Sequence, residues 1–326
     1  MVHRPDSGTL GPVNFEQIKD EIPELNKLES TIQTITFDPP LDSSNVNPAV
    51  WVKIARTIYE NYHQFDGFVV LHGTDTMSYT ASALSFMFEN LDKPIVMTGS
   101  QLPVGTLRTD GKENLITAVE IAAATRGGKS IVPEVSIYFD SKLYRGNRTV
   151  KRDADLFSAF RSVNYPELAV AGIDIRFRTD FIHYPEKGTP LKLNTRFNDN
   201  VLILKIFPGM NEKVFSAMLT IPGLRGIVLE TFGSGNVPTD RWLIRCIKNA
   251  VRENMLLLNV TQCEGGSVSM GQYETSLELM EAGVVSGRDI TTEAAITKLM
   301  FLLGQDLSYA ETKNELNKNL RGEISE

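Results

Sequence analysis

A threonine and an aspartate stand side by side at Thr74 and Asp75, directly after the apolar run Phe68–Leu71. A threonine hydroxyl can attack an acyl group once a base removes its proton, and a neighbouring carboxylate can bind a substrate's ammonium group. The same two residue types also cap helices, because their side-chain oxygens accept hydrogen bonds from the first free amides of a helix. From residue type and position alone, capping of the helix that begins at Met77 is the simpler interpretation.

Two further polar clusters follow predicted strands. Asp42, Ser43 and Ser44 come after a strand ending near Phe37 and are also typical of a plain turn. Lys151 ends a basic stretch that is typical of a solvated loop. Lys151 can take part in catalysis only if its side chain reaches the crevice. There, a nearby aspartate and partial burial would set the protonation state of its amine. Open α/β sheets bind ligands at the carboxyl ends of their strands, so the three clusters can belong to one site.

Apolar strands alternate with helical patterns along the chain. Most of these strands are apolar on successive residues, which is typical of a parallel sheet covered by helices on both faces. The predicted strands are Thr31–Phe37, Gly67–Leu71, Pro94–Thr98, Val135–Phe139, Val201–Phe207, Gly226–Leu229 and Leu256–Val260. Helix start signals occur at Asn47-Pro48, at Asp110 with Glu113 and at Thr291 with Glu293, and a further helix is predicted over Met77–Asn90.

The polar segment 176–200 interrupts this alternation with prolines and a glycine, and it is predicted to be a linker or a long surface connection. The sequence therefore predicts an α/β protein. Its large N-terminal domain, residues 1–190, has a mainly parallel sheet flanked by helices and carries most of the site. A smaller C-terminal α/β domain covers residues 200–326.

Composition excludes several classes of protein. The 326 residues are 42% hydrophobic and 22% charged, as in a folded globular chain. The net charge is −7 and no block of lysine and arginine is present, so we expect no nucleic-acid partner. The apolar runs are too short to cross a bilayer. Cys246 and Cys263 are too few for a disulfide framework, and no secretory signal is recognisable, so we expect a cytoplasmic protein.

Several catalytic signatures are absent from the sequence. The four histidines form no HExxH motif, so we expect no zinc hydrolase, and the absence of GxxxxGK[ST] excludes a P-loop; no GxSxG motif occurs either. The segment Gly233–Asn236 follows a strand and weakly resembles a dinucleotide-binding turn, but its third glycine is lacking.

The three polar clusters together resemble the asparaginase/glutaminase family, and within it the cytoplasmic (type I) L-asparaginases. The most specific part of this resemblance is HGTDTM with the residues that follow it. The resemblance covers nearly the whole chain and runs through HGTDTMSYTASALSFMFENLDKPIVMTGSQLP, LDSSN, DGKENL, YRGNRTVK, ETFGSGN, NVTQC and NLRGE. With the family in view, function rather than capping is favoured at Thr74 and Asp75.

The resemblance implies hydrolysis of L-asparagine to L-aspartate and ammonia without metal or cofactor. It also implies assembly into homodimers or homotetramers whose neighbouring subunits close the site. Matching positions give Thr74 and Asp75 as the second catalytic threonine and its aspartate, with Lys151 completing the group. Asp42, Ser43 and Ser44 match the loop that holds the α-groups of the amino acid, and Asn236 is a looser match to an asparagine contributed across the dimer interface. Which threonine attacks the substrate stays open.

The family's glycine-rich TGGTIG turn, which bears the first catalytic threonine, has no counterpart in the sequence. We therefore expect that a longer gene product supplies this turn and a preceding strand. A flexible-loop tyrosine of many relatives is also missing among residues 7–12. The alternative to an asparaginase is a catalytically impaired amino-acid-binding module. Within the same chemistry, a glutaminase or a tRNA-dependent amidotransferase subunit stays open.

Overall fold

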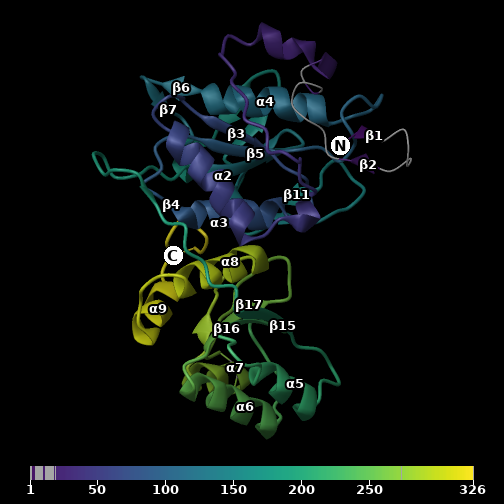
Figure 1. The fold of residues 1–326 in the computed structure, drawn as a ribbon. Helices are drawn as coiled ribbons and strands as arrows, with labels where there is room; N and C mark the ends of the chain where they lie inside the picture. Colours follow the sequence, from purple (N-terminus) through teal and green to yellow (C-terminus); the bar gives the residue numbers. More distant parts are fainter. Residues whose placement is uncertain (1, 4–9, 12–17, 19, 273, 326) are drawn as a thin grey trace. The chain divides into compact units, whose positions relative to one another are not determined.

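The computed structural model describes residues 2–3, 10–11, 18, 20–272 and 274–325. The chain divides into two compact units, Met1–Asn194 and Thr195–Glu326. Each unit builds helices around a sheet of its own (Figure 1), which confirms the predicted α/β fold class. No helix among the described residues is long and apolar enough to span a bilayer.

A six-stranded sheet with the order β13-β12-β9-β8-β5-β3 organises the first unit. Neighbours β3, β5 and β8 run parallel, whereas the pairs from β8 to β13 are antiparallel. Every residue of β5 and β8 is buried, which explains their continuous apolar sequences; β3 lies at the sheet edge and is only half-buried. The strands are β3 (Phe68–Leu71), β5 (Ile95–Thr98), β8 (Val135–Phe139), β9 (Lys142–Arg145), β12 (Ala169–Ala171) and β13 (Ile175–Phe177).

Helices cover both faces of this sheet (Figure 1). Helix α4 (Gly111–Ala123) packs on one face, and α3 (Met77–Met87) packs on the other with α2 (Pro48–Asn61) against it. The predicted start of α2 is confirmed: Asn47 Oδ1 accepts hydrogen bonds from the amides of Ala49 and Val50 at 3.0 and 3.3 Å.

The end of one predicted helix and one predicted strand in the first unit were wrong. The predicted helix Met77–Asn90 ends at Met87, because the next two residues form β4 (Phe88–Glu89), which pairs with β14 (Lys192–Leu193) inside the expected linker. Thr31–Phe37 forms no strand. Its apolar residues do not alternate regularly, Ile35 is 61% exposed, and the segment joins no sheet of the described residues.

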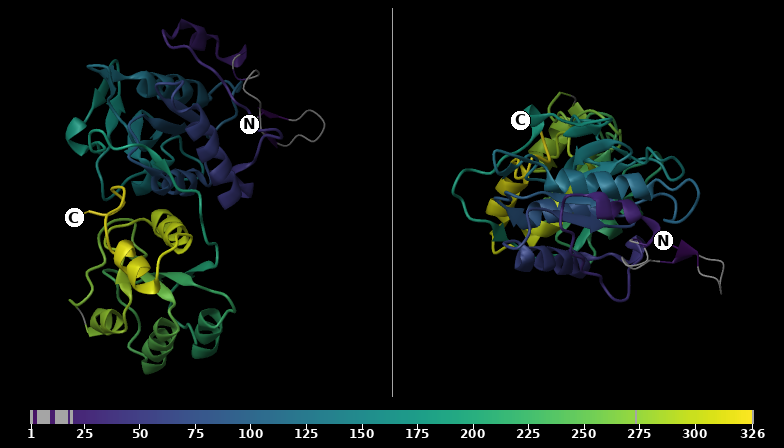
Figure 2. Two further views of the ribbon diagram at one scale, coloured as in Figure 1. Left: turned by 60° about the vertical axis from the view of Figure 1, so that its left-hand side comes forward. Right: turned by 90° about the horizontal axis from the view of Figure 1, so that it is seen from above.

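The second unit contains an all-parallel sheet with the order β15-β16-β17-β18. Figure 2 shows helices on both sides of this sheet, and the start of α8 is as predicted, because Thr291 Oγ1 accepts from the Ala294 amide. The strands are β15 (Val201–Lys205), β16 (Gly226–Thr231), β17 (Leu256–Thr261) and β18 (Val285–Ser286), and the helices are α5 (Glu212–Leu219), α6 (Arg241–Arg252), α7 (Glu274–Glu281), α8 (Thr292–Leu303) and α9 (Tyr309–Leu316).

A buried ion pair fixes the C-terminal segment to α8. Lys298 Nζ lies 2.6 Å from Glu323 Oε1, and both side chains are fully buried. The Glu323 carboxylate also accepts hydrogen bonds from the Leu320 and Arg321 amides. A buried charge that loses its partner is strongly destabilising, so the integrity of the second unit depends on this pair.

We expect Glu323→Ala to lower the free energy of unfolding of the second unit by about 3–5 kcal/mol, because it leaves the Lys298 ammonium buried without its counter-charge. Glu212→Ala is the control, since that carboxylate forms an exposed pair with Arg245 in the same unit, worth about 0–1 kcal/mol. Urea denaturation measures both, and equal small losses in the two variants would contradict this account.

Candidate active site

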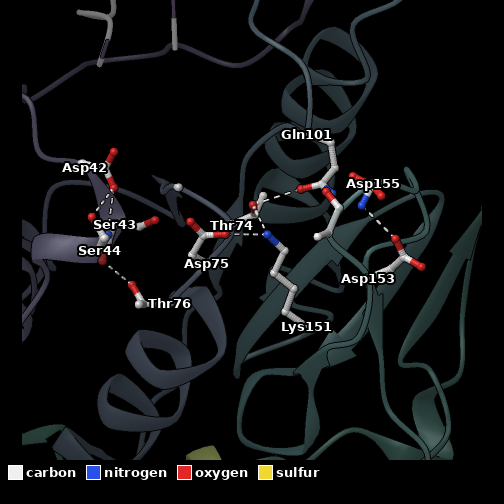
Figure 3. Close-up of polar contacts among 12 residues, drawn as sticks. Asp42, Ser43, Ser44, Thr74, Asp75, Thr76, Gln101, Lys151, Asp153 and Asp155 are labelled. Atoms are coloured by element: carbon white, nitrogen blue, oxygen red, sulfur yellow. Dashed lines mark hydrogen bonds and ion pairs between the residues drawn. The ribbon is translucent and has the colours of Figure 1, made fainter. Parts of the chain in front are cut away.

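Thr74, Asp75 and Lys151 meet at the carboxyl end of β3. Thr74 and Asp75 lie in the turn between β3 and α3. Lys151 Nζ donates to Thr74 Oγ1 at 2.9 Å and to Asp75 Oδ1 at 2.6 Å (Figure 3). The Lys151 side chain is 17% exposed, whereas Asp75 is 67% exposed, so the amine is shielded while the carboxylate is open to an approaching ligand. The arrangement combines a hydroxyl, an amine that can exchange a proton with it, and an accessible negative charge.

The segment that carries Lys151 is anchored by buried polar groups. Arg145 Nε lies 2.6 Å from Glu134 Oε2 with both side chains almost fully buried, and the guanidinium lies over the Tyr165 ring at 4.3 Å. The next residues are also buried, so the interpretation of this basic stretch as a solvated loop was wrong. The chain then enters β10 (Val150–Lys151), which pairs with β11 (Phe160–Arg161) and directs Lys151 toward the turn after β3.

The turn of Asp42, Ser43 and Ser44 packs against the same β3–α3 turn. Thr76 Oγ1 donates to the Ser43 carbonyl at 2.7 Å, and a Cβ at Gly73 would lie 2.6 Å from Ser43 Oγ, so only glycine fits at that position. Thr76 is the N-cap residue of α3, but no side chain caps the helix there.

The Asp42 carboxylate is oriented within its own turn. Its Oδ1 accepts hydrogen bonds from the Ser44 amide at 2.9 Å and from the Ser44 hydroxyl at 2.8 Å. These bonds lower the pKa of Asp42, the backbone amide contributing most. Asp42 therefore provides a second negative charge, on the turn that contacts the β3–α3 turn.

His72 connects the β3–α3 turn to Thr80 in a defined tautomer. Trp51 Nε1 can only donate, and it donates to Thr80 Oγ1 at 3.1 Å. His72 Nδ1 lies 2.7 Å from the Gly73 carbonyl, which can only accept, so Nδ1 carries the hydrogen. His72 Nε2, 2.9 Å from Thr80 Oγ1, then accepts the hydroxyl hydrogen. Burial lowers the pKa of His72, which keeps this neutral arrangement.

Gln101 joins the site although the sequence analysis did not single it out. Thr74 Oγ1 donates to Gln101 Oε1 at 3.0 Å. The predicted capping pair of Asp110 and Glu113 was wrong, because the Asp110 side chain does not cap α4 and its carboxylate instead accepts hydrogen bonds from the backbone amides of Gln101 and Leu102. The available signal was the position of Gln101 just after β5, on the same sheet edge as Thr74.

Asn236 belongs to the second unit. It lies in the turn after β16, where its backbone exchanges two hydrogen bonds with Phe232 at 2.8 and 2.9 Å. The contacts that join Thr74, Asp75 and Lys151 lie within the first unit, so a role for Asn236 stays a prediction. Among the residues that the structure describes, no group of three or more His, Cys, Asp or Glu side chains is placed to hold a metal ion.

Comparison with known proteins identifies the family. Residues 1–183 match the model "Asparaginase, N-terminal", and residues 200–316 match the glutaminase/asparaginase C-terminal domain. L-asparaginase 1 of Escherichia coli K12 is 41% identical over 305 residues, which cover 93% of this chain and 88% of that protein. The 60 kDa lysophospholipase of mouse is 41% identical over 93% of this chain, but the chain spans only 53% of that relative.

Solved structures agree with these matches. The crystal structure of L-asparaginase I from Vibrio cholerae is 42% identical and has a TM-score of 0.87, with 97% of this chain and 93% of that chain covered. The L-asparaginase of Thermococcus kodakarensis has a TM-score of 0.89 at 32% identity, with 99% of this chain and 95% of that chain covered. Fold and comparisons together define an α/β protein with two asparaginase-type segments. The chain belongs to the asparaginase/glutaminase family.

The neutral state of His72 predicts a pH dependence of stability. Its pKa in the folded protein lies below the usual 6.5, so below about pH 6.5 the unfolded chain binds more protons than the folded one. The contribution of His72 to stability is therefore complete above pH 6.5 and is lost as the pH falls toward the folded-state pKa. We expect the difference in unfolding free energy between wild type and His72→Gln to shrink from pH 7.5 to pH 5, as measured by urea denaturation. A constant difference would contradict this prediction.

Proposed function

We propose that the protein hydrolyses the side-chain amide of L-asparagine to give L-aspartate and ammonia. The observation that carries the proposal is the contact of Lys151 Nζ with Thr74 Oγ1 and Asp75 Oδ1. Membership of a family whose named members include L-asparaginases supports it. The proposed enzyme is an amidohydrolase without metal or cofactor, and cytoplasmic location and assembly into dimers or tetramers belong to the same proposal.

The chemistry assigned to the pair of Thr74 and Lys151 is proton transfer. When the Lys151 amine is neutral, it takes a proton through Thr74 Oγ1 from the attacking oxygen, which belongs to a threonine hydroxyl or to water. The new C–O bond forms at the amide carbon, the C–N bond breaks, and the proton returns to the leaving ammonia. Where a threonine has attacked, water then cleaves the ester and releases aspartate.

The carboxylates and hydroxyls around this pair provide binding groups for the amino acid. Asp75 is exposed and negatively charged, which suits a substrate ammonium group. The neighbouring turn of Asp42, Ser43 and Ser44 is held in place by the Thr76 contact, and we assign the α-groups of the substrate to it. Asn236 is proposed as a further contact supplied across a subunit interface.

Release of ammonia from L-asparagine by the purified protein tests the proposal directly. We expect turnover that saturates with asparagine and produces aspartate in equal amount. If calorimetry detects binding of aspartate and no ammonia is released, the protein is an amino-acid-binding module and the proposed activity is wrong.

We expect Asp75→Asn and Lys151→Met each to lower kcat by about 10²–10⁴-fold, because each removes a group that handles a proton or charge in the transition state. Thermal unfolding and oligomeric state are expected to stay close to wild type. Lys142→Met is the matched control, since Lys142 lies on β9 with 45% of its side chain exposed and its ion pair with Glu167 is long, at 3.9 Å. Near-wild-type turnover in Asp75→Asn would contradict the assignment.

We also expect asparagine to be preferred to glutamine by about 10–200-fold in kcat/KM. Glutamine is longer by one methylene, so its amide carbon overshoots a nucleophile placed for the shorter side chain. Steady-state ammonia release from the two amino acids measures this ratio. Equal specificity constants would refute the preference while leaving amide hydrolysis intact.

A further inference from the structure

The side chain of Gln101 forms hydrogen bonds through both its oxygen and its nitrogen; Figure 3 shows the bond to Thr74. Its Oε1 accepts from Thr74 Oγ1 at 3.0 Å, and its Nε2 donates to the carbonyls of Ala154 and Leu156 at 3.0 and 3.2 Å. The two carbonyls lie in the loop of the hairpin formed by β10 and β11. Gln101 therefore links the loop after β5, the turn after β3 and the hairpin that carries Lys151.

These bonds leave one orientation for the amide of Gln101. Backbone carbonyls only accept hydrogen bonds, so the NH₂ group must face residues 154 and 156 and the oxygen must face Thr74. An amide oxygen also only accepts, so the hydroxyl hydrogen of Thr74 points to Gln101. The lone pairs of Thr74 Oγ1 are then turned to Lys151, which donates to them as an ammonium group.

The loop that carries Gln101 and the hairpin loop that it contacts are each held by further hydrogen bonds. The Asp110 carboxylate accepts hydrogen bonds from the backbone amide of Gln101 at 3.0 Å and from the backbone amide of Leu102 at 3.1 Å. In the hairpin loop, Asp153 Oδ1 accepts from the amides of Asp155 and Leu156 at 2.8 and 2.9 Å, and these bonds lower the pKa of Asp153. The hydrogen bonds of Gln101 thus join two ordered loops across the site.

We propose that Gln101 is a positioning residue for the proton transfer between Thr74 and Lys151. It holds the hydroxyl hydrogen of Thr74 away from Lys151 while the lysine is charged, and it ties the hairpin of Lys151 to the turn of Thr74. When Lys151 becomes neutral, the hydrogen turns from Gln101 Oε1 to the amine. This role rests on the proposed asparagine hydrolysis. It assigns to Gln101 the task of setting the geometry between Thr74 and Lys151.

Two substitutions separate positioning from folding. Gln101→Leu removes all three hydrogen bonds, and we expect kcat for asparagine to fall about 10–100-fold with KM changed less than about threefold, because small misplacements of reacting groups have effects of that size. Gln101→Glu places a negative charge beside Thr74 and Lys151, which holds the amine protonated to higher pH. The ascending limb of the kcat–pH profile is then expected to move up by about one unit or more.

The matched control is Gln305→Leu in the second unit. Gln305 Nε2 also donates to two backbone carbonyls, those of Arg196 and Phe301, at 3.1 and 2.7 Å. We expect this variant to keep the wild-type kcat and pH profile. The proposal is overturned if the ascending limb of the kcat–pH profile does not move in Gln101→Glu, because a purely structural role changes the amount of active protein and not the protonation of Lys151. It is also overturned if Gln101→Leu and Gln305→Leu lose activity equally.

Hydrogen exchange provides a readout that does not depend on turnover. Gln101→Leu is expected to accelerate exchange of the amides of residues 152–158, whereas Gln305→Leu leaves them unchanged. If the wild type releases no ammonia from asparagine, the proposed function fails while this exchange still tests the link made by Gln101. Unchanged exchange in Gln101→Leu would show that the link does not hold the hairpin, which contradicts the proposal.

Discussion

The ammonium group of Lys151 reaches Thr74 and Asp75, residues that lie 77 and 76 positions away in the chain. A contact of this kind requires that two separate turns keep their places to within a fraction of an ångström. The hairpin of Lys151 starts from a segment anchored by the buried pair of Glu134 and Arg145, and the turn of Thr74 is fixed between β3 and α3. The chemistry proposed for the site depends on these two supports.

Several residues next to the candidate site have structural roles. The Thr76 hydroxyl donates to the Ser43 carbonyl, and the His72 ring connects the Gly73 carbonyl to Thr80. Gly73 lacks a side chain because the Ser43 hydroxyl occupies the space where a Cβ would lie. These neighbours hold the turn that carries Thr74 and Asp75, the residues to which, together with Lys151, we assign the proposed chemistry.

The parts of the fold that follow local rules were predictable from the sequence. Strands β5 and β8 are apolar throughout because both faces are covered, and Asn47 and Thr291 are genuine helix caps. Asp110 carries the same signal, but its carboxylate accepts the amides of the loop after β5 instead. A sequence shows that a hydrogen-bond acceptor is present, but it does not show which backbone amide donates to that acceptor. The burial around Arg145 and the contact of Gln101 with Thr74 also depend on residues that are distant in the sequence, so neither was predicted. Thr74, Asp75 and Lys151 are proposed as site residues because the residues around them match a family; their position at a strand end was not sufficient alone.

A double-mutant cycle on Thr74→Val and Lys151→Met tests most directly whether these residues act as one proton-transfer unit. Single-turnover rates of ammonia release from asparagine are measured for wild type, both single variants and the double variant. Because either substitution alone removes the function of the pair, the double variant is expected to react about as fast as the slower single variant. Rate losses that multiply in the double variant would show that Thr74 and Lys151 act independently and would contradict the account.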